Sequence, residues 1–247
     1  MKSENYNRTL VIGDIHGYYK HLEKLLEIVN YDNNSDRIIF LGDYIDRGDN
    51  PKKTIDFVIE LSLENTNVIS LMGNHEDLML SNITEDGRHS KSIWMSNGSD
   101  STLKSFGLSL YGSLNLIDIK YINFLSSLKQ IFIDEELMMV FSHAGIDPTK
   151  PVHKQDLFDE YRGPMWIRSD FYNNKKPADA YTFIFGHTPT YNMREGLYDV
   201  LWEDNKIGID TGLCYGYKLT ALEIIPGQRL KAYSVNREFA FNVEYQP

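Results

Sequence analysis

Five short apolar segments of this chain each lead into a residue that can bind a metal ion. In every case a glycine, a serine or a Phe-Gly step separates the segment from an Asp, Asn or His. The five stretches are Gly13-Asp14-Ile15-His16-Gly17, Gly42-Asp43, Gly73-Asn74-His75-Glu76, Ser142-His143-Ala144-Gly145 and Phe185-Gly186-His187-Thr188. Ligands of open α/β sheets bind at the carboxyl ends of strands, and glycine permits the sharp turns needed there. The pattern therefore predicts that these polar side chains meet at one edge of a sheet.

The first third of the chain alternates between predicted strands and helices. Apolar runs at Thr9–Ile12, Arg37–Leu41 and Asn67–Met72 predict three strands. Leucines at helical spacing predict a helix over Tyr18–Asn30, and Asn50-Pro51 is typical of an N-cap followed by proline at the first helical position. Strands and helices that alternate with short connections indicate βαβ units and a parallel core.

The rest of the chain changes in character after the third predicted strand. Residues from Asp77 to about Leu128 predict a helical excursion with turns, and the second half is rich in strands. The predicted strands are Gln130–Ile133, Leu137–Ser142, Thr182–Phe185, Lys206–Ile209, Tyr217–Ile225 and Leu230–Val235. We expect an α/β fold with a central β-sandwich of mixed sheets flanked by helices. No linker-like tract interrupts the 247 residues, so we expect one domain spanning 1–247.

Composition excludes several classes of protein. The formal net charge of −10 argues against a partner that is a nucleic acid or an anionic membrane surface. No stretch approaches the roughly 20 apolar residues that cross a bilayer, and no secretory segment precedes the first strand. The single cysteine, Cys214, cannot form an intramolecular disulfide, which fits a reducing cytoplasm. We therefore expect a cytoplasmic protein.

One such motif alone has a simple structural explanation, because a turn Asp and a surface His are common. The five motifs together do not have this simple explanation. Three carboxylates (Asp14, Asp43, Asp46) would converge with four histidines (His16, His75, His143, His187). Desolvated carboxylates repel one another unless cations lie between them. Mixed oxygen and nitrogen ligands suit Mn, Fe or Zn better than Mg or Ca.

The ordered motifs resemble a known family. GDIHG (13–17), GDYIDRG (42–48), GNHE (73–76), HAG (143–145) and GHT (186–188) are similar to the signature of the phosphoprotein phosphatase (PPP) family of metallophosphoesterases, and IDTG (209–212) extends it. Trp94 with Asn97-Gly98, and Trp166-Ile167-Arg168, further resemble the compact bacterial and phage serine/threonine phosphatases.

The resemblance implies a dinuclear metal centre. Asp14 and His16 would hold one divalent ion, Asp43 would bridge two, and the second would be completed by Asn74, His143 and His187. Manganese is the expected metal, with iron or zinc as alternatives. In such a centre a hydroxide bridging the two metals attacks phosphorus in line with the leaving oxygen.

The same resemblance implies catalytic and phosphate-binding roles. His75 would protonate the leaving oxygen, and Asp46 would orient its imidazole. Arg47 and Arg168, with Asn74, would bind the phosphoryl oxygens, for which the planar guanidinium is suited. Many phage-type relatives carry an arginine directly before GNHE; this chain has Met72 there. Phosphate binding would therefore rest on Arg47 and Arg168.

Three functions remain open at this point. The first is a phosphomonoesterase acting on phosphoserine or phosphothreonine, and also on phosphotyrosine, in a protein or peptide. The second is a dinucleoside polyphosphate hydrolase, such as a diadenosine tetraphosphatase, because that family shares the five motifs. The third is a non-catalytic metal-binding scaffold, against which the complete set of ligands together with His75 and Asp46 argues. Sequence leaves the oligomeric state and any regulatory partner undetermined.

Overall fold

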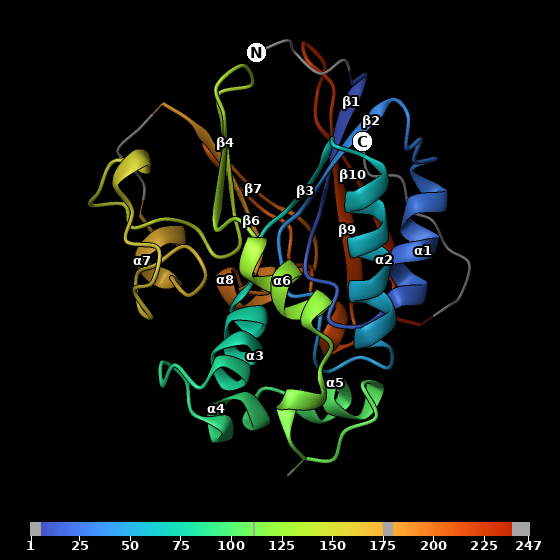
Figure 1. The fold of residues 1–247 in the computed structure, drawn as a ribbon. Helices are drawn as coiled ribbons and strands as arrows, with labels where there is room; N and C mark the ends of the chain where they lie inside the picture. The colour runs from blue at the N-terminus through green and yellow to red at the C-terminus, as the bar shows by residue number, and fades with distance from the viewer. Residues whose placement is uncertain (1–5, 111, 175–179, 239–247) are drawn as a thin grey trace.

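The computed structural model describes residues 6–110, 112–174 and 180–238, in which the strands form two five-stranded mixed sheets (Figure 1). The first sheet has the order β10-β9-β1-β2-β3. Its strands are β1 (Arg8–Ile12), β2 (Asp36–Phe40), β3 (Val68–Ser70), β9 (Lys218–Ile224) and β10 (Lys231–Asn236). Strands β1, β2 and β3 are mutually parallel, and β9 is antiparallel to both of its neighbours, β1 and β10.

The second sheet has the order β4-β5-β6-β8-β7. Its strands are β4 (Ile131–Asp134), β5 (Met139–Ser142), β6 (Thr182–Phe185), β7 (Leu201–Glu203) and β8 (Lys206–Gly208). Strands β5, β6 and β8 are parallel, while β4 and β7 run antiparallel at the two edges. Each sheet thus contributes three parallel strands. Their carboxyl ends point toward the lower side of the view in Figure 1, where α3 and α8 lie.

Apolar side chains on both faces of each sheet explain why the central strands are almost continuously hydrophobic. Val11 and Ile39 of the first sheet pack against Phe141 and Ile184 of the second, which makes the interior of the sandwich. Neighbouring residues of β1 and β2 point the other way and pack under the helices of the first sheet. Burial on this scale contributes about 2 kcal/mol for each large apolar side chain. The predicted sandwich of mixed sheets flanked by helices is confirmed.

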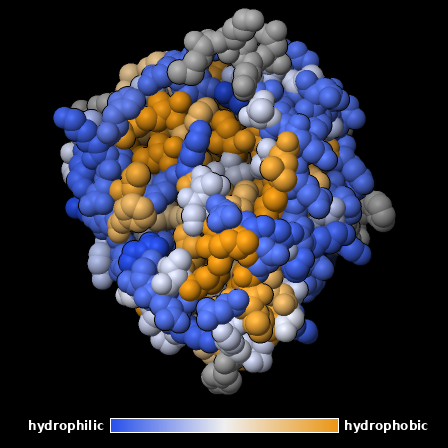
Figure 2. Space-filling model, viewed as in Figure 1, coloured by the Kyte–Doolittle hydropathy of each residue, from blue (hydrophilic) through white to orange (hydrophobic). Residues whose placement is uncertain are grey.

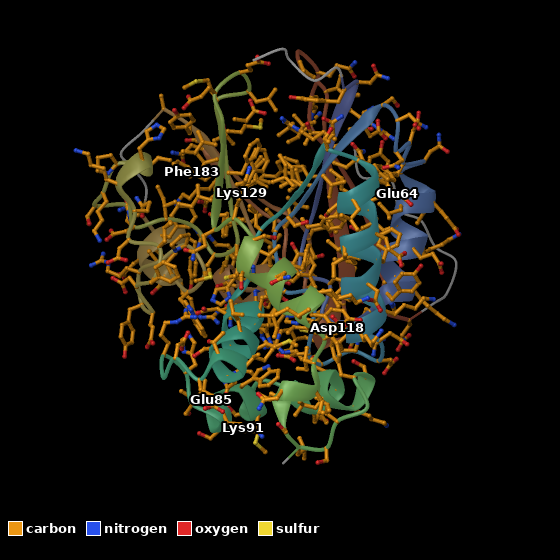
Figure 3. All side chains as sticks on the ribbon, viewed as in Figure 1. Glu64, Glu85, Lys91, Asp118, Lys129 and Phe183 are labelled. Atoms are coloured by element: carbon orange, nitrogen blue, oxygen red, sulfur yellow. The ribbon has the colours of Figure 1, made fainter. Side chains whose placement is uncertain are left out.

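The helices have the following bounds in the structure. They are α1 (Tyr19–Ile28), α2 (Pro51–Glu64), α3 (Asn74–Thr84), α4 (Lys91–Ser96), α5 (Ser99–Ser105), η1 (Leu114–Leu116), α6 (Ile119–Ser127), η2 (Val152–Lys154), α7 (Ser169–Tyr172), α8 (Thr190–Met193) and η3 (Leu213–Tyr215). Helices α1 and α2 cover the outer face of the first sheet, and α3 to α6 form the predicted excursion (Figure 1). In Figure 3, Glu85, Lys91 and Asp118 mark this excursion on the lower side, away from Glu64 at the end of α2.

Several boundaries differ from the sequence predictions. The predicted excursion starts earlier than Asp77, since helix α3 begins at Asn74, where the side chain of Glu76 accepts the backbone N–H of the N-cap residue Gly73. The edge strand β7 was not predicted; its three residues are too few to show a period. Pro51 is the first residue of α2, as expected, but the side chain of Asn50 makes no capping hydrogen bond. The two strands predicted on either side of residues 134–136 are present as the antiparallel pair β4 and β5.

Candidate active site

The predicted ligands meet where the parallel strands of both sheets end. Asp43 lies at the centre, since two groups of potential ligands share it: one with His16 and His75, the other with His143 and His187. Within each group the ligand atoms lie within 4.8 Å of one another, and all are buried. The two oxygens of Asp43 face different histidines: Oδ2 lies 3.4 Å from Nε2 of His16, and Oδ1 lies 3.4 Å from Nε2 of His143. This carboxylate is placed to serve two cations.

Backbone carbonyls orient two of the histidines. Nδ1 of His16 lies 3.0 Å from the carbonyl oxygen of Ile45, and Nδ1 of His143 lies 3.0 Å from that of Leu41. Because a carbonyl only accepts, each Nδ1 carries the proton and each Nε2 offers its lone pair to the centre. Burial lowers the pKa of both imidazoles, to the greater extent at His16, so the neutral, ligating form is favoured.

The contacts within the second ligand group suit a cation. Nε2 of His143 and Nδ1 of His187 lie 3.2 Å apart, and Oδ1 of Asn74 lies 3.1 and 3.0 Å from them. The lone pairs of Nε2 of His143 and Oδ1 of Asn74 therefore point to the same place. Nδ1 of His187 adds a third lone pair there, unless this nitrogen carries the proton of the ring. Burial also lowers the pKa of His187 well below its usual range. A divalent ion can bind all three ligand atoms, and nitrogen and oxygen ligands of this kind fit such an ion.

Asp14 lies beside these groups and belongs to neither. Both of its carboxylate oxygens accept from the backbone N–H of His187, at 3.2 and 3.1 Å. Burial, followed by the neighbouring charges of Asp210 and Asp43, raises the pKa of Asp14 well above its usual range. For Asp43 burial acts in the same direction, but the imidazoles of His143, His75 and His16 outweigh it and lower the pKa. The predicted pairing of Asp14 with His16 on one metal stays a prediction.

Asp210 has no role in the sequence prediction, although the IDTG motif pointed to its position. It follows β8, the third parallel strand of the second sheet, and is buried next to Asp14. One carboxylate oxygen accepts from the backbone N–H of Gly212 at 3.0 Å. Burial raises the pKa of Asp210 to about 6. Residues after all six parallel strands therefore surround the centre.

Two positions next to the ligands require glycine, because a ligand carboxylate lies directly against the backbone there. A Cβ at Gly73 would overlap with a carboxylate oxygen of Asp43, and a Cβ at Gly186 would overlap with one of Asp14. Among the described non-glycine residues, eight have positive φ, and five of these belong to the site. The five are His16, Asp43, Asp46, Arg47 and His187. Left-handed backbone is sterically costly for these residues and is found where side chains must be aimed.

Glu76 fixes the loops that carry the ligands. Its carboxylate is fully buried and accepts from the backbone N–H groups of Gly73, Asp43 and Tyr44, at 3.0, 2.8 and 2.8 Å. Burial, and then the charge of Asp43, raises the pKa of Glu76 well above its usual range. Glu76 thus joins the start of α3 to the loop after β2, as a support rather than a ligand.

His75 and Asp46 form the pair expected of an acid and its orienting carboxylate. Nδ1 of His75 lies 2.7 Å from Oδ2 of Asp46, while Nε2 faces Asp43 at 3.9 Å. Asp46 in turn accepts from Nε1 of Trp94 at 3.0 Å and from the hydroxyl of Thr102. Trp94 is fully buried and also holds this carboxylate. The helical excursion thereby fixes the orientation of His75.

The two predicted phosphate-binding arginines lie on opposite sides of the centre. Nη1 of Arg47 lies 2.9 Å from Nε2 of His16 and 3.2 Å from Sγ of Cys214. Nη1 of Arg168 donates to the hydroxyl of Thr188 at 3.0 Å. In the part of the chain that the structure describes, no carboxylate lies within 4.0 Å of either guanidinium. Neither Asp43 nor Asp46 therefore forms an ion pair with Arg47.

Two further residues occupy supporting positions. Burial raises the pKa of Cys214 to about 12, so its thiol is protonated and unsuited to act as a nucleophile. Met72, where many phage-type relatives have arginine, is buried, and its backbone N–H donates to the carbonyl of Lys129. Trp166 donates weakly to Asp77 at 3.4 Å and packs on His89, which connects the loop of Arg168 to α3.

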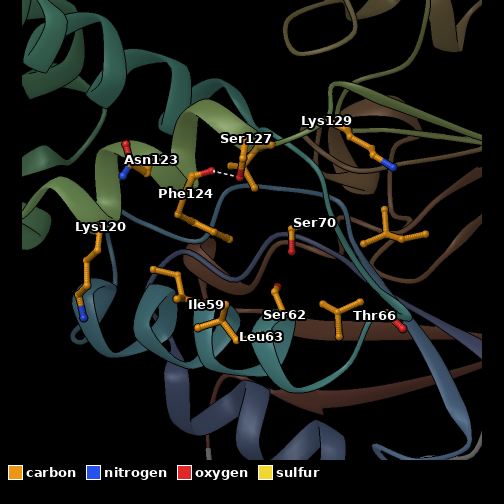
Figure 4. A pocket seen from close by; sticks show the side chains of 13 residues that line it. Ile59, Ser62, Leu63, Thr66, Ser70, Lys120, Asn123, Phe124, Ser127 and Lys129 are labelled. Atoms are coloured by element: carbon orange, nitrogen blue, oxygen red, sulfur yellow. Dashed lines mark hydrogen bonds between the residues drawn. The ribbon is translucent and has the colours of Figure 1, made fainter.

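An apolar groove lies away from this centre. It has a volume of about 580 Å³ between α2, β3 and α6 (Figure 4). Figure 2 shows apolar side chains in a hollow of this face of the molecule. The groove is lined by side chains such as Leu63, Val68 and Phe124 and contains no carboxylate or imidazole. Hydrolytic chemistry therefore belongs to the strand ends, not to this groove.

Comparison with known proteins agrees with this geometry. Residues 7–220 match the calcineurin-like phosphoesterase family, so the chain belongs to this family of metallophosphoesterases. A curated relative, the asymmetrical bis(5'-nucleosyl)-tetraphosphatase PrpE of Bacillus cereus, is 24% identical over 245 residues, which cover 86% of this chain and 88% of that protein.

Two solved structures show the same fold. A putative diadenosine tetraphosphatase has a TM-score of 0.67 at 21% identity, covering 96% of each chain. A serine/threonine phosphatase from Saccharomyces cerevisiae has a TM-score of 0.66 at 16% identity, covering 99% of this chain and 84% of that one. The metallophosphoesterase fold inferred from the motifs is thus confirmed. No helix among the described residues is long and apolar enough to span a membrane.

Proposed function

We propose that this chain is a metal-dependent phosphoester hydrolase in which His75 protonates the leaving oxygen. The observation that carries the proposal is the His75–Asp46 pair, at 2.7 Å, beside a carboxylate that faces two groups of metal ligands. A site that only bound metal would not need a buried imidazole held by a carboxylate and aimed at the same centre. This argues against a non-catalytic scaffold.

The residues divide the reaction between them. Two divalent ions held by Asp14, His16, Asp43, Asn74, His143 and His187 would lower the pKa of a bound water and neutralise phosphoryl charge. Arg47 and Arg168, together with the amide of Asn74, bind the phosphoryl oxygens and orient the phosphorus. As the bond from water oxygen to phosphorus forms and the ester bond breaks, Nε2 of His75 gives its proton to the leaving oxygen. Asp46 holds the imidazole throughout.

The first proposed substrate is a phosphorylated protein or peptide. Two arginines without carboxylate partners suffice for one phosphoryl group, and the Trp166-Ile167-Arg168 pattern resembles the compact serine/threonine phosphatases. Phosphoserine and phosphothreonine come first, with phosphotyrosine as a further substrate. Manganese is the proposed metal because of the mixed oxygen and nitrogen ligands. Nucleic acids and membranes are not proposed as partners.

A second candidate is a dinucleoside polyphosphate. The bis(5'-nucleosyl)-tetraphosphatase of Bacillus cereus named above favours it, since the two chains match over nearly their full lengths. The half-exposed ring of Tyr215, over which the guanidinium of Arg47 lies, also favours it. The reaction would use the same centre, with a phosphate rather than an alkoxide as the leaving group.

A substrate panel with Mn²⁺ separates these candidates. Rates are measured on phosphoserine, phosphothreonine and phosphotyrosine peptides and on diadenosine tetraphosphate. If the phosphopeptides have the higher kcat/KM, the chain is a protein phosphatase; if diadenosine tetraphosphate does, the second candidate is correct. Absence of turnover on all four would contradict the proposed function.

Removal of Arg47 should weaken phosphate binding. Hydrogen bonds to a charged group contribute about 1.5–3 kcal/mol, so we expect Arg47→Ala to raise the inhibition constant of inorganic phosphate by at least about tenfold. Arg229→Ala is the matched control, because Arg229 is exposed in the turn after β9, at the opposite end of β1. An unchanged inhibition constant in Arg47→Ala would make Arg47 a structural residue only.

A further inference from the structure

Four tyrosines form a continuous cluster beside the candidate active site. They are Tyr191, Tyr198, Tyr215 and Tyr217, which we call the tyrosine cluster. The ring centroid of Tyr191 lies 6.1 Å from that of Tyr215 and 5.1 Å from that of Tyr217, and Tyr217 lies 4.8 Å from Tyr198. The rings therefore form a path rather than isolated contacts.

One end of the cluster touches a proposed phosphate-binding residue. The guanidinium of Arg47 lies over the ring of Tyr215, 5.3 Å from its centroid. The cluster also packs on the turn that follows Asp210. A Cβ at Gly212 would come within 2.9 Å of the Tyr217 ring and 3.1 Å of the Tyr191 ring. The rings are thus fixed relative to the phosphoryl-binding groups.

The other end of the cluster is open to solvent and borders a cavity. Tyr198, Tyr215 and Tyr217 are 48%, 50% and 36% exposed. A pocket of about 350 Å³ lies against Tyr198 and Tyr217, and its other lining residues include Lys218, Asn236 and Arg237. Adjacent exposed aromatic rings are a common feature of binding surfaces.

We propose that the tyrosine cluster binds the nucleobase of a nucleoside-phosphate substrate whose phosphoryl group is held by Arg47 and Arg168. The inference rests on the second candidate function, hydrolysis of a nucleoside phosphate, and names the residues that would hold its base. Stacking on aromatic side chains binds any base, because every base has a π-face. Asn236 and Lys218 provide hydrogen-bonding groups at the pocket for the polar edge of the base.

The length of the cluster favours a nucleobase over the ring of phosphotyrosine. A tyrosyl ring is joined to phosphorus by one oxygen, so with its phosphate at Arg47 it reaches Tyr215. A nucleobase is separated from the phosphate by a ribose, so it extends farther from Arg47 than a tyrosyl ring does, toward Tyr217 and Tyr198. Binding of phosphotyrosine should therefore depend on Tyr215, and binding of a nucleobase on Tyr217 and Tyr198. Substitution of these tyrosines distinguishes the two ligands.

Equilibrium binding tests the proposal without turnover. Adenosine 5'-monophosphate and ribose 5-phosphate share the sugar and the phosphate and differ in the base. Their dissociation constants are measured by calorimetry on the Mn²⁺-loaded His75→Asn variant, in which hydrolysis is suppressed. Base stacking of this kind predicts that adenosine 5'-monophosphate binds about tenfold more tightly. Tyr217→Leu on the same background should reduce the ratio to near one, and Tyr217→Phe should retain it.

A control variant and three other results complete the test of the tyrosine cluster. Tyr19→Leu removes a ring that packs on Phe57 of α2, and the ratio should remain unchanged. Equal affinity for the two ligands in the parent protein, or a ratio unaffected by Tyr217→Leu and Tyr198→Leu, would overturn the proposal. A ratio lost only in Tyr215→Leu would assign the site to a ring directly on the phosphate and would also overturn it. Failure of the proposed function appears separately, as wild-type protein that hydrolyses no phosphoester.

Discussion

Asp43→Asn should deplete both metal positions at once. The two carboxylate oxygens of Asp43 face His16 and His143, each at 3.4 Å, so one substitution affects both ligand groups. Asparagine keeps one oxygen and loses the negative charge. Even substitutions one step removed from a metal ligand weaken metal affinity by about 10–100-fold, so we expect a loss of at least about 100-fold for this shared ligand. Metal content is measured by elemental analysis after dialysis against a fixed Mn²⁺ concentration.

Asp56→Asn provides the comparison. Asp56 is a partly buried carboxylate on α2 that accepts from Lys52, Lys120 and Tyr121, outside the site. We expect this variant to retain two metal ions per chain. Full occupancy of both positions in Asp43→Asn would show that Asp43 does not bridge them.

His75→Asn should lower turnover while leaving metal content intact. The loss of a positioned general acid costs about 10²–10⁴-fold in rate. The loss should be greatest on a phosphoserine peptide, whose alkoxide leaving group needs the proton, and much smaller on 4-nitrophenyl phosphate, whose leaving group is stable as an anion. The steady-state kcat of the wild type and of His75→Asn is measured on each substrate at the same Mn²⁺ occupancy. The ratio of the two kcat values gives the loss for that substrate.

His153→Asn is the control for a histidine outside the centre, since His153 is exposed on η2. Its kcat should match that of the wild type on both substrates. A rate on the phosphoserine peptide that is unchanged in His75→Asn would remove His75 from the proton-transfer step. An equal loss on both substrates would instead indicate that His75 acts in metal or phosphate binding.

Sequence reasoning located the centre because its residues follow a local rule. A short apolar run, then a glycine or serine and then a ligand can be recognised five times without knowing the fold, and each ligand lies within four residues of its strand. The same rule would have found Asp210, which follows β8 after Gly208-Ile209, had the IDTG motif been read in the same way. Convergence of these residues follows from three parallel strands in each sheet.

Supporting contacts were less accessible because their partners are far apart in the chain. Trp94 and Thr102 bind Asp46 across 48 and 56 residues, and Cys214 contacts Arg47 across 167. No periodicity or spacing links such positions. Short elements were also missed or displaced: β7 has three residues, and the start of α3 is set by the buried carboxylate of Glu76.

The sequence by itself determined the class of this protein, since residues placed directly after strands must gather at their carboxyl ends once the strands are parallel. It also predicted the candidate ligands and the candidate acid, because those predictions depend on residue type and local position. Only the tertiary structure decided that Asp43 faces both ligand groups, that Asp46 is held by the helical excursion, and that four tyrosines adjoin Arg47. These features depend on the packing of distant segments, which local sequence patterns do not encode.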